Sequence, residues 1–323
     1  MKKTIKHKIS SQDVTIIIPT HSASVTDVVS AVQIQEYVGQ VTIFVIDDGP
    51  RDRSAEMLSG ITYIKNEKNI GLANTLNKGI RLAKTPYIIT LHQDCIPISS
   101  QWLTELMIPF KDISVVLSSS EQILPVDVWN KFSFWHRVFT VPELKLQTTI
   151  SEHATAYKRD VVLTCGLFDS QTHRTAGEDT DLFIKMRHYG LLVESHARVK
   201  HVHAPHNDSL WNFIKKVYLR DNEAMGVLHR KYFFKMGFQF YYDFLRTILF
   251  IFLITFLFFN HYMSLLILGI IVIFANYRLF KVLKHIQDIH LIFLPFIYIA
   301  IWFMGFFAMW KGFISAQQNW FNN

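Results

Sequence analysis

The sequence predicts an α/β domain with a mostly parallel sheet, followed by C-terminal transmembrane helices. Two observations predict the α/β domain: short apolar runs rich in β-branched residues alternate with segments of helical spacing, and each run ends in polar or turn-forming residues. A third observation predicts the membrane region, because Phe, Ile and Leu dominate residues 240–310 whereas the chain up to about residue 235 is ordinary globular sequence. The 323 residues suffice for one full-sized domain with an additional segment.

Four apolar segments are expected to be buried strands, and two segments between them are expected to be helices. The expected strands are 14–19, 41–46, 61–65 and 87–91, and the expected helices are 25–37 and 71–84. In the second helix, Leu72, Leu76 and Ile80 share one face. Alternating strands and helices imply right-handed crossovers and parallel pairing. Strands this apolar should be covered on both faces.

Polar residues follow three of these strands. They are Thr20 and His21 after Pro19, then Asp47 and Asp48, then His92, Gln93 and Asp94. A single Asp after a strand is usually part of a turn or a helix cap. Ligands of such sheets bind beyond the carboxyl ends of the strands, so three polar sets at one edge favour a site. For the last set, the residues alone leave metal, substrate and a plain turn open.

A further candidate group lies at residues 177–206. Segment 177–190 is expected to be a helix with Glu178, Asp179 and Asp181 in its first turn, where acids favour the helix dipole. Capping accounts for one or two of these acids and leaves at least one to face a cleft. His201 and His203 lie two residues apart, so on a strand they face the same side. We expect His196 and His206 to be surface or interface residues.

The composition indicates the cellular compartment of the protein and the kinds of partner that it binds. Two cysteines, Cys95 and Cys165, make no disulfide framework and suit a reducing compartment. The basic N-terminus lacks an apolar segment, so we expect a short tail and no signal peptide. The net charge of +7 is concentrated before the apolar tail, where the positive-inside rule places cytoplasmic charge. We therefore expect a membrane partner and no nucleic acid.

The C-terminal third is expected to contain interfacial helices and about three spans. After Ser209, an expected N-cap, Leu210, Phe213 and Val217 form an apolar stripe flanked by lysines, which fits either a bilayer surface or a core helix. Residues 241–262 and 289–310 have about the length a spanning helix needs, and 263–280 is either a marginal span or half of a hairpin. We expect an interfacial region at 207–240, transmembrane helices at 241–312 and a tail at 313–323. The charge placement predicts a multi-pass protein of the cell membrane whose catalytic domain, residues 1–206, is cytoplasmic.

Five sequence blocks resemble the family 2 glycosyltransferases, inverting enzymes with the Rossmann-like GT-A fold. The blocks are "VTIIIPTHS", "IFVIDDGP", "KNIGLANTLNKGI", "YIITLHQD" and "GEDTDLFIKMRHYG", which occur in the family's order and cover residues 14 to about 205. The C-terminal spans are similar to those of members that act on lipid-linked acceptors. "LHQDCIP" and the Glu-Asp block resemble rhamnosyltransferase-like members.

The resemblance implies roles for particular residues. Asp94 takes the role of the metal-binding acid, Asp179 that of the general base beside Glu178, and Asp48 that of the base contact beside Asp47. His92 stands where many members have Asp, and it is a candidate for the metal or the sugar nucleotide. His201 or His203 lies where some relatives add a histidine to the metal. The expected donor contacts are Pro19, Thr20, His21, Asp47, Asp48, Asn69, Gly71, Asn77, His92 and Gln93.

The family's chemistry is consistent with these residues. A divalent ion, Mg²⁺ or Mn²⁺, stabilises the departing diphosphate of a nucleotide-diphosphate sugar. An imidazole ligand would favour Mn²⁺. An inverting displacement also needs a base for the acceptor hydroxyl, whereas a lipid phosphate is already ionised. The expected activity is sugar transfer to a lipid-linked or polysaccharide acceptor. The alternatives are a polyprenyl-phosphate glycosyltransferase and a non-catalytic nucleotide-sugar-binding membrane subunit.

Overall fold

The chain forms two compact units, which are described separately. The computed structural model describes residues 12–21, 23–51, 59–173, 176–202 and 209–316. The first unit comprises Met1–Pro125, Leu146–Ser170 and Lys185–Ala204, and the second comprises Val126–Lys145, Gln171–Ile184 and Pro205–Asn323. The predicted domain boundaries at residues 206, 240 and 312 remain predictions.

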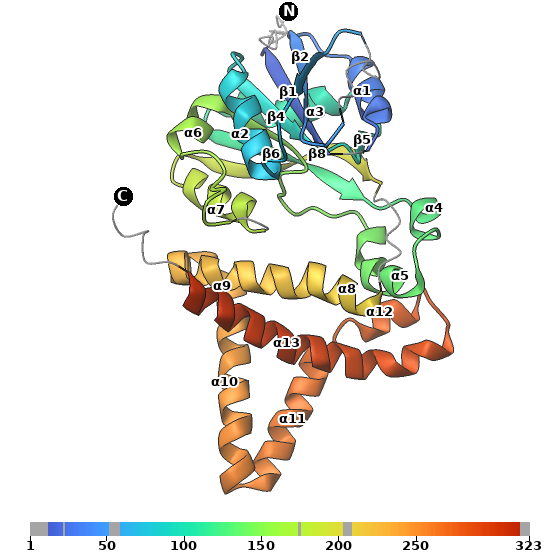
Figure 1. The fold of residues 1–323 in the computed structure, drawn as a ribbon, viewed down its shortest axis with the longest axis vertical. Coiled ribbons are helices and arrows are strands. Elements are labelled where there is room, and N and C mark those ends of the chain that lie inside the picture. Colours follow the sequence, from blue (N-terminus) through green and yellow to red (C-terminus); the bar gives the residue numbers. More distant parts are fainter. Residues whose placement is uncertain (1–11, 22, 52–58, 174–175, 203–208, 317–323) are drawn as a thin grey trace, which may run out of the picture. The chain divides into compact units, whose positions relative to one another are not determined.

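The first unit is built on one sheet of eight strands among the described residues (Figure 1). The strand order is β3-β2-β1-β4-β7-β6-β8-β5. The strands are β1 Val14–Thr20, β2 Val41–Asp47, β3 Thr62–Lys65, β4 Tyr87–Leu91, β5 Cys95–Pro97, β6 Val115–Ile123, β7 Ala154–Lys158 and β8 Leu191–His201. The pairs among β1 to β4 are parallel, as is β6 with β8, whereas β7 and β5 pair with their neighbours in antiparallel fashion.

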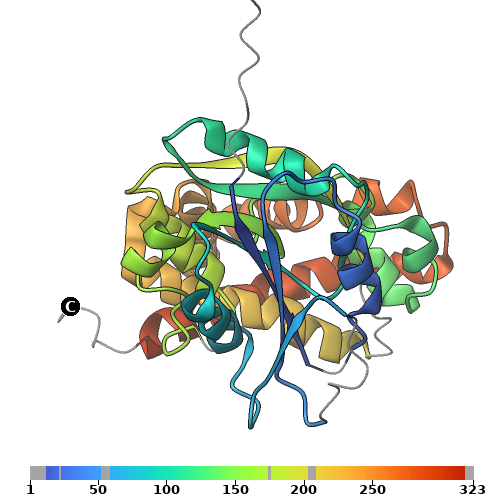
Figure 2. The ribbon, with the colours of Figure 1, turned by 90° about the horizontal axis from the view of Figure 1, so that it is seen from above.

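Helices cover both faces of this sheet (Figure 2). They are α1 Thr26–Gln33, α2 Leu72–Leu82, α3 Trp102–Met107 with the 3₁₀ turn η2 Ile108–Lys111, and α6 Arg159–Thr164. On one face, the apolar side chains of α1 and α3 join a core cluster with Ile16 and Ile18 of β1. Ile17, between them, faces the other side and meets α2 at Gly79. Alternate residues of β1 thus serve two cores, which is why the strand is apolar throughout.

The four predicted strands and two predicted helices of the first half are confirmed, as is the α/β domain. The sheet is more mixed than the mostly parallel sheet we expected. The reason lies at residues 115–158, where the sequence pattern loosens but the chain forms β6 and β7. Strand β7 lies between β4 and β6 and pairs with both in antiparallel fashion, which interrupts the parallel order.

The second unit is almost entirely helical among its described residues. Its elements are α4 Val126–Trp129, α5 Phe134–Thr140, η3 Val141–Leu144, most of α7 Glu178–Met186, α8 Leu210–Phe213, the π-helical η4 Ile214–Leu219, α9 Arg220–Tyr232, η5 Phe233–Met236, α10 Phe238–Phe259, α11 His261–Ala275, α12 Leu279–Leu283, η6 Ile289–Phe293 and α13 Leu294–Ser315. The predicted cap at Ser209 is present: its hydroxyl accepts a hydrogen bond from the Asn212 N–H at 3.3 Å.

Helices α9 and α13 pack side by side at very short distance (Figure 1). Two glycines allow this approach. A Cβ atom on Gly226 would lie 1.9 Å from the carbonyl oxygen of Met309, and one on Gly312 would lie 1.9 Å from that of Glu223. Close backbone contact through small residues is also how helices associate in membranes.

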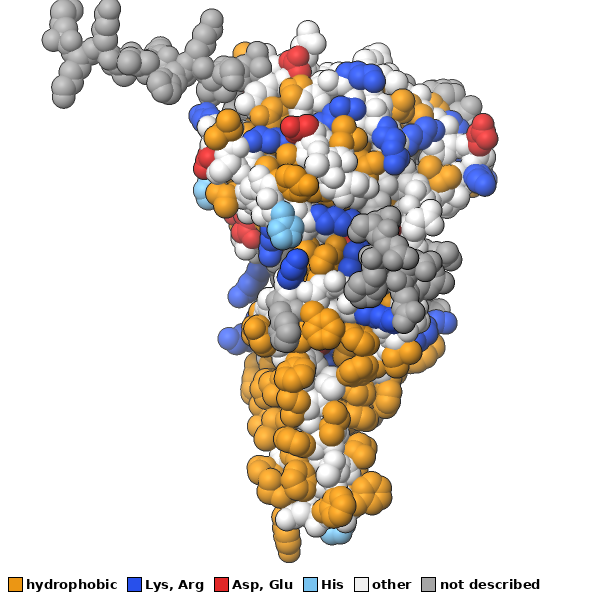
Figure 3. Space-filling view, turned by 90° about the vertical axis from the view of Figure 1, so that its left-hand side faces the viewer, with side chains coloured by type: hydrophobic (Ala, Val, Ile, Leu, Met, Phe, Trp, Pro, Cys, Tyr) orange, Lys and Arg blue, Asp and Glu red, His pale blue; other side chains and the backbone are white. Residues whose placement is uncertain are grey.

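Helices α10 and α11 form a hairpin that turns at Asn260 (Figure 1). The Asn260 side chain caps α11 by accepting from the Met263 N–H at 3.1 Å. Hydrophobic side chains cover the outside of this hairpin (Figure 3). Phe258 and Phe259 are 80% and 81% exposed, and Tyr262 is 87% exposed. Such a surface is typical of contact with an apolar partner or a lipid bilayer.

The number of predicted spans exceeds the number of helices that meet both length and composition. Among the described residues, Phe238–Phe259 and Ile289–Ser315 are long and apolar enough to cross a membrane. The middle segment forms α11, which has only 15 residues and is therefore about 22 Å long, against a hydrocarbon core of about 30 Å. Two such helices give weak support for membrane association.

Candidate active site

An open pocket lies at the carboxyl ends of β1, β2 and β4 in the first unit. Its volume is about 230 Å³. Its lining residues are Pro19, Thr20, His21, Asp48, Asn69, Gly71, Leu72, Thr75, His92, Gln93 and Asp94. Nine of these are predicted site residues, which separate strands bring to one edge as expected.

Asp48 supports the loop that forms one wall of the pocket. Its Oδ1 accepts hydrogen bonds from Ile70 N and Asn66 Nδ2, both at 2.9 Å, and its Oδ2 accepts from Gly71 N at 2.9 Å. Gly71 has a φ of 82°, which favours glycine, and it directly precedes α2. The carboxylate therefore shapes the loop as well as facing the pocket. Its predicted contact with a nucleotide base remains a prediction.

Two predicted donor contacts, Asp47 and Asn77, do not line this pocket. Asp47 is fully buried; it accepts hydrogen bonds from Gly49 N and from the Tyr63 hydroxyl, both at 2.8 Å. The Asn77 amide exchanges two hydrogen bonds with the Phe168 backbone, at 2.8 and 3.0 Å. Both side chains thus stabilise the loops around the site.

The segment after β4 is anchored to its neighbours. The Thr20 hydroxyl donates to Gln93 Oε1 at 2.6 Å, which joins the ends of β1 and β4. Strand β5 pairs with β8 so that Cys95 lies opposite His201. This register brings His201 Nε2 to 3.5 Å from Asp94 Oδ2. Asp94 and His201 are thus placed together, as the resemblance implied, whereas His203 lies outside the described residues.

Asp94 and His201 fit a divalent ion. Asp94 lines the pocket and its side chain is 33% exposed, so it is accessible from that space. A carboxylate oxygen and an imidazole nitrogen are the donors that Mn²⁺ accepts. Cys95, beside them, is fully buried in the apolar core, so its thiol is a small core side chain.

His92 lies at the start of a row of imidazoles. Its ring centroid is 4.6 Å from that of His153, whose centroid is in turn 5.0 Å from that of His201. Burial, reinforced by His153, lowers the pKa of His92 to about 3, so the ring is neutral at physiological pH. Glu152 Oε1 lies 3.7 Å from His92 Nε2. His196, in contrast, is exposed, as expected.

The predicted acidic helix start is present in α7, and its three acids differ in their surroundings. Asp181 is fully buried and accepts from Lys231 Nζ at 2.5 Å and from the Tyr232 hydroxyl at 2.6 Å, so it holds α7 to α9. Asp179 Oδ1 accepts from Thr180 N at 2.6 Å. Burial raises the pKa of Glu178, whose Oε2 is buried with no hydrogen-bond partner. These acids belong to the second unit, whereas the pocket belongs to the first.

Glu152 and His153 are site residues that the sequence analysis missed. They directly precede β7, inside the segment where the apolar pattern weakens. The available signal was an adjacent Glu and His immediately before the alternating run "ATAYK". That signal is weak by itself, because only the pairing of β7 with β4 brings the two residues to His92.

Comparisons with known proteins agree with this geometry. Residues 15–162 match the family model for glycosyl transferase family 2. A similar solved structure is the mannosyltransferase PcManGT from Pyrobaculum calidifontis in complex with GDP-Man and Mn²⁺, with a TM-score of 0.56 and 14% identity over 96% of this chain and 88% of that one. Another is GalNAc-T7 with UDP, GalNAc and Mn²⁺, with a TM-score of 0.53 and 14% identity over 74% of this chain and 51% of that one. No curated protein matches the chain.

The family match over residues 15–162 confirms the predicted resemblance to the family 2 glycosyltransferases, and the shared fold confirms the predicted GT-A domain. Both similar structures are glycosyltransferase structures that contain Mn²⁺.

Proposed function

We propose that this family 2 glycosyltransferase moves a sugar from a nucleotide-diphosphate sugar to a lipid-linked or polysaccharide acceptor at the cytoplasmic face of a membrane, with inversion and with Mg²⁺ or Mn²⁺. The observation that carries the proposal is the pocket at the strand ends, which gathers Asp48, His92 and Asp94 in a domain of this fold. The metal-bearing similar structures support the donor class and the ion.

Within this proposal, the chain's own residues bind and orient the donor. The Asn69–Gly71 loop, fixed by Asp48, forms one wall, and the Thr20–Gln93 hydrogen bond fixes the opposite strand ends. Asp94 and His201 would hold the ion, which neutralises charge on the diphosphate when bound. Asp179 would accept the proton of an acceptor hydroxyl, and the partly buried Glu178 would position it.

The apolar outside of the α10–α11 hairpin supports action at a membrane. A lipid-linked acceptor would be presented at such a surface. The resemblance of "LHQDCIP" and the Glu-Asp block to rhamnosyltransferase-like members favours a polysaccharide or lipid-linked glycan acceptor and a hexosyl or rhamnosyl transfer.

A donor screen tests the proposal. The full chain in detergent or native membranes is given radiolabelled nucleotide sugars one at a time, with Mg²⁺, Mn²⁺ or EDTA, and label transferred to lipid or glycan is measured. We expect transfer from one class of donor, lost in EDTA and restored by added metal. Donor binding with no transfer or hydrolysis in any condition would instead support the non-catalytic subunit.

Asp179→Asn distinguishes the two catalytic alternatives. With a hydroxyl acceptor, we expect transfer to fall by about 10²–10⁴-fold while donor binding persists, because a general base contributes that much. With a polyprenyl-phosphate acceptor, transfer should persist, since the nucleophile is already ionised. Asp127→Asn, an exposed acid in α4 of the same unit, is the matched control. Full turnover with a hydroxyl acceptor would remove Asp179 from the base role.

A further inference from the structure

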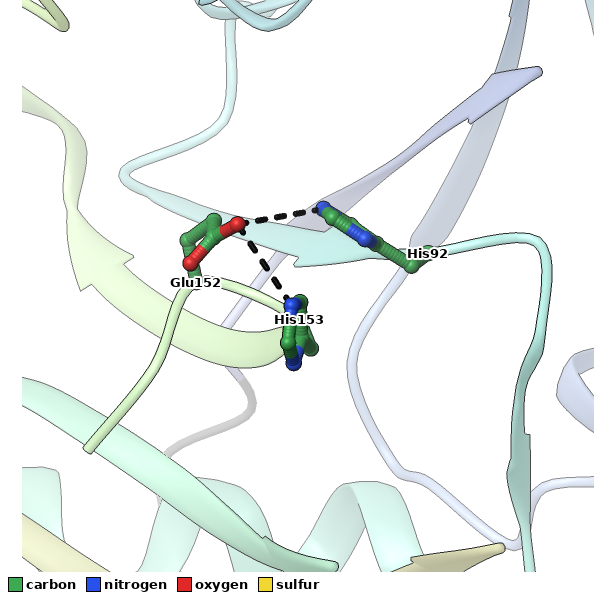
Figure 4. A group of neighbouring side chains, drawn as sticks. All are labelled: His92, Glu152 and His153. Carbon is green, nitrogen blue, oxygen red and sulfur yellow. Dashed lines mark ion pairs between the residues drawn. The ribbon is translucent and has the colours of Figure 1, made fainter. Parts of the chain in front are cut away.

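Three side chains converge beside the pocket without forming hydrogen bonds to one another. His92 Nε2 and His153 Nε2 lie 3.7 and 3.6 Å from the same oxygen, Oε1 of Glu152 (Figure 4). All three donor atoms lie within 4.8 Å of one another. Both distances are too long for a hydrogen bond.

The distances suit three ligands of one small ion. Nitrogen and oxygen ligands lie about 2.0–2.1 Å from Zn²⁺, so two ligands of a tetrahedral ion are about 3.3 Å apart. The two separations from Glu152 Oε1 are a few tenths of an ångström longer, and a small side-chain rotation would close that difference. The donor nitrogens of the two imidazoles lie within 4.8 Å of each other. Two neutral imidazoles and one carboxylate are also a donor set that borderline transition ions prefer to Mg²⁺.

The backbone holds the three residues in place. His92 N donates to His153 O at 2.8 Å, continuing the antiparallel pairing of β4 with β7. The Thr90 hydroxyl donates to Glu152 O at 2.5 Å. The group is therefore carried by two paired strands, and ligands on rigid elements lose little entropy when an ion binds.

The ring of His153 is oriented in the way that metal-ligating histidines usually are. Its Nδ1 lies 3.2 Å from Gln122 Oε1 in β6. If Nδ1 carries the proton and donates it to this oxygen, Nε2 keeps its lone pair, which faces Glu152 and can bind an ion. On the other side, His92 Nε2 is buried and has no hydrogen-bond partner among the residues that the structure describes. A buried ring nitrogen without a partner costs free energy, and an ion would satisfy it.

We propose that His92, Glu152 and His153 form a binding site for a divalent transition-metal ion, with Zn²⁺ the best match, separate from the ion expected at Asp94. Because His92 also lines the pocket, an open coordination position of this ion would be available to an oxygen atom of a pocket ligand or to water. The site does not depend on sugar transfer, since its ligands are defined by their own geometry.

The neighbouring group, Asp94, Cys95 and His201, is the other candidate for such an ion. It is less suitable for Zn²⁺, because Cys95 is fully buried in the core cluster, where burial disfavours the thiolate that would bind the ion, and its Sγ lies 3.9 Å from the Asp94 Oδ1 carboxylate oxygen. That leaves two ligands, against three in the group of His92.

Cobalt binding tests the site without any activity assay. The full chain in detergent, treated with EDTA and dialysed, is titrated with Co²⁺, and the visible d–d absorption reports an ion with nitrogen ligands in low coordination. We expect one ion with this low-coordination spectrum per chain, in addition to any ion at Asp94 and His201, and we expect Zn²⁺ but not Mg²⁺ to displace it. Glu152→Gln and His153→Asn, both close in size to the native residues, should each weaken Co²⁺ binding at least ten-fold.

Three further variants sharpen the test, one that should weaken binding and two controls that should not. Gln122→Ala should weaken binding about 10–100-fold, as loss of an orienting partner does. Asp94→Asn should leave the Co²⁺ spectrum and affinity unchanged, and so should His196→Ala, which removes an exposed imidazole of β8.

Melting curves complete the measurement: Zn²⁺ should raise the melting temperature of wild type but not of Glu152→Gln. Unchanged Co²⁺ affinity in both Glu152→Gln and His153→Asn, or loss of the signal in Asp94→Asn, would overturn the proposal.

Discussion

The two units place polar and apolar residues in opposite ways. In the first, aliphatic strands are buried and polar groups gather at the strand ends, as at Asp94. In the second, Phe258 and Tyr262 are exposed on α10 and α11, while Asp243 and Arg246 are buried and paired at 2.8 Å. Asp243 also accepts a bond from His229 at 2.7 Å. The difference is what the proposed function requires, with water around the first unit and lipid in contact with part of the second.

The comparison predicts that Asp94, at the strand ends of the first unit, serves chemistry, whereas the buried pair Asp243 and Arg246 of the second unit serves stability. The following variants test this from the largest expected effect to the smallest.

Asp94→Asn should lower metal-dependent transfer by about 10³-fold or more, because it removes a ligand of the ion that stabilises the leaving diphosphate. The melting temperature should change little, since Asp94 lies at the strand edge. Radiolabelled transfer and thermal unfolding measure the two effects. Asp27→Asn, an exposed acid of α1, is the control. A large loss of stability with transfer retained would contradict the assignment.

Asp243→Ala should lower the free energy of unfolding by about 3–5 kcal/mol, because it leaves the Arg246 guanidinium buried without its partner. Thermal unfolding in detergent measures this. Leu257→Ala, on the exposed side of the same helix, should change the melting temperature little. The double variant Asp243→Leu/Arg246→Leu should recover part of the loss. Equal effects of Asp243→Ala and Leu257→Ala would remove the distinction between the two units.

Gly226→Ala should destabilise the second unit by about 1–3 kcal/mol, because the added methyl group would overlap the Met309 carbonyl and force α9 from α13. Gly269→Ala in α11 is the matched control. A Cβ there meets no atom within 4 Å, so the change should be neutral or slightly stabilising. Protease resistance and thermal unfolding compare the two, and similar behaviour would contradict the close packing.

Glu178→Gln should change the pH dependence of stability. The pKa of Glu178 is raised by burial in the folded chain, so the unfolded chain releases this proton first as pH rises. Between the two pKa values the unfolded state binds fewer protons, and the stability of wild type falls with rising pH. The melting temperature of Glu178→Gln minus that of wild type should therefore increase as the pH rises above about 4.3. Parallel curves would show that burial does not raise this pKa.

Local patterns were sufficient to predict the parallel strands, their order along the chain and the polar residues at their ends. His92, Gln93 and Asp94 were found because they follow an apolar run directly. Glu152 and His153 were not, because their position depends on a pairing between strands some 60 residues apart. Long-range pairing of this kind leaves little trace in either segment alone.

The same limit applies to the second unit. Hydropathy identified the apolar helices, but it could not show that α11 is a 15-residue arm of a hairpin. Nor could it show that Asp243 and Arg246, three residues apart on α10, face each other and His229 inside the unit. In the sequence they are only two charges at the start of an apolar run.

The short arm of the α10–α11 hairpin has a consequence for the choice of membrane. Helix α10 is about 33 Å long and α11 about 22 Å, and they share a polar tip at Asn260. If the hairpin enters a bilayer, the shorter arm cannot match the full hydrocarbon thickness, so the lipid must thin, the hairpin must tilt, or the tip must stay below the far leaflet. The acyl-chain length of the lipid would then determine how well the hairpin matches the bilayer thickness, independently of the lipid headgroup.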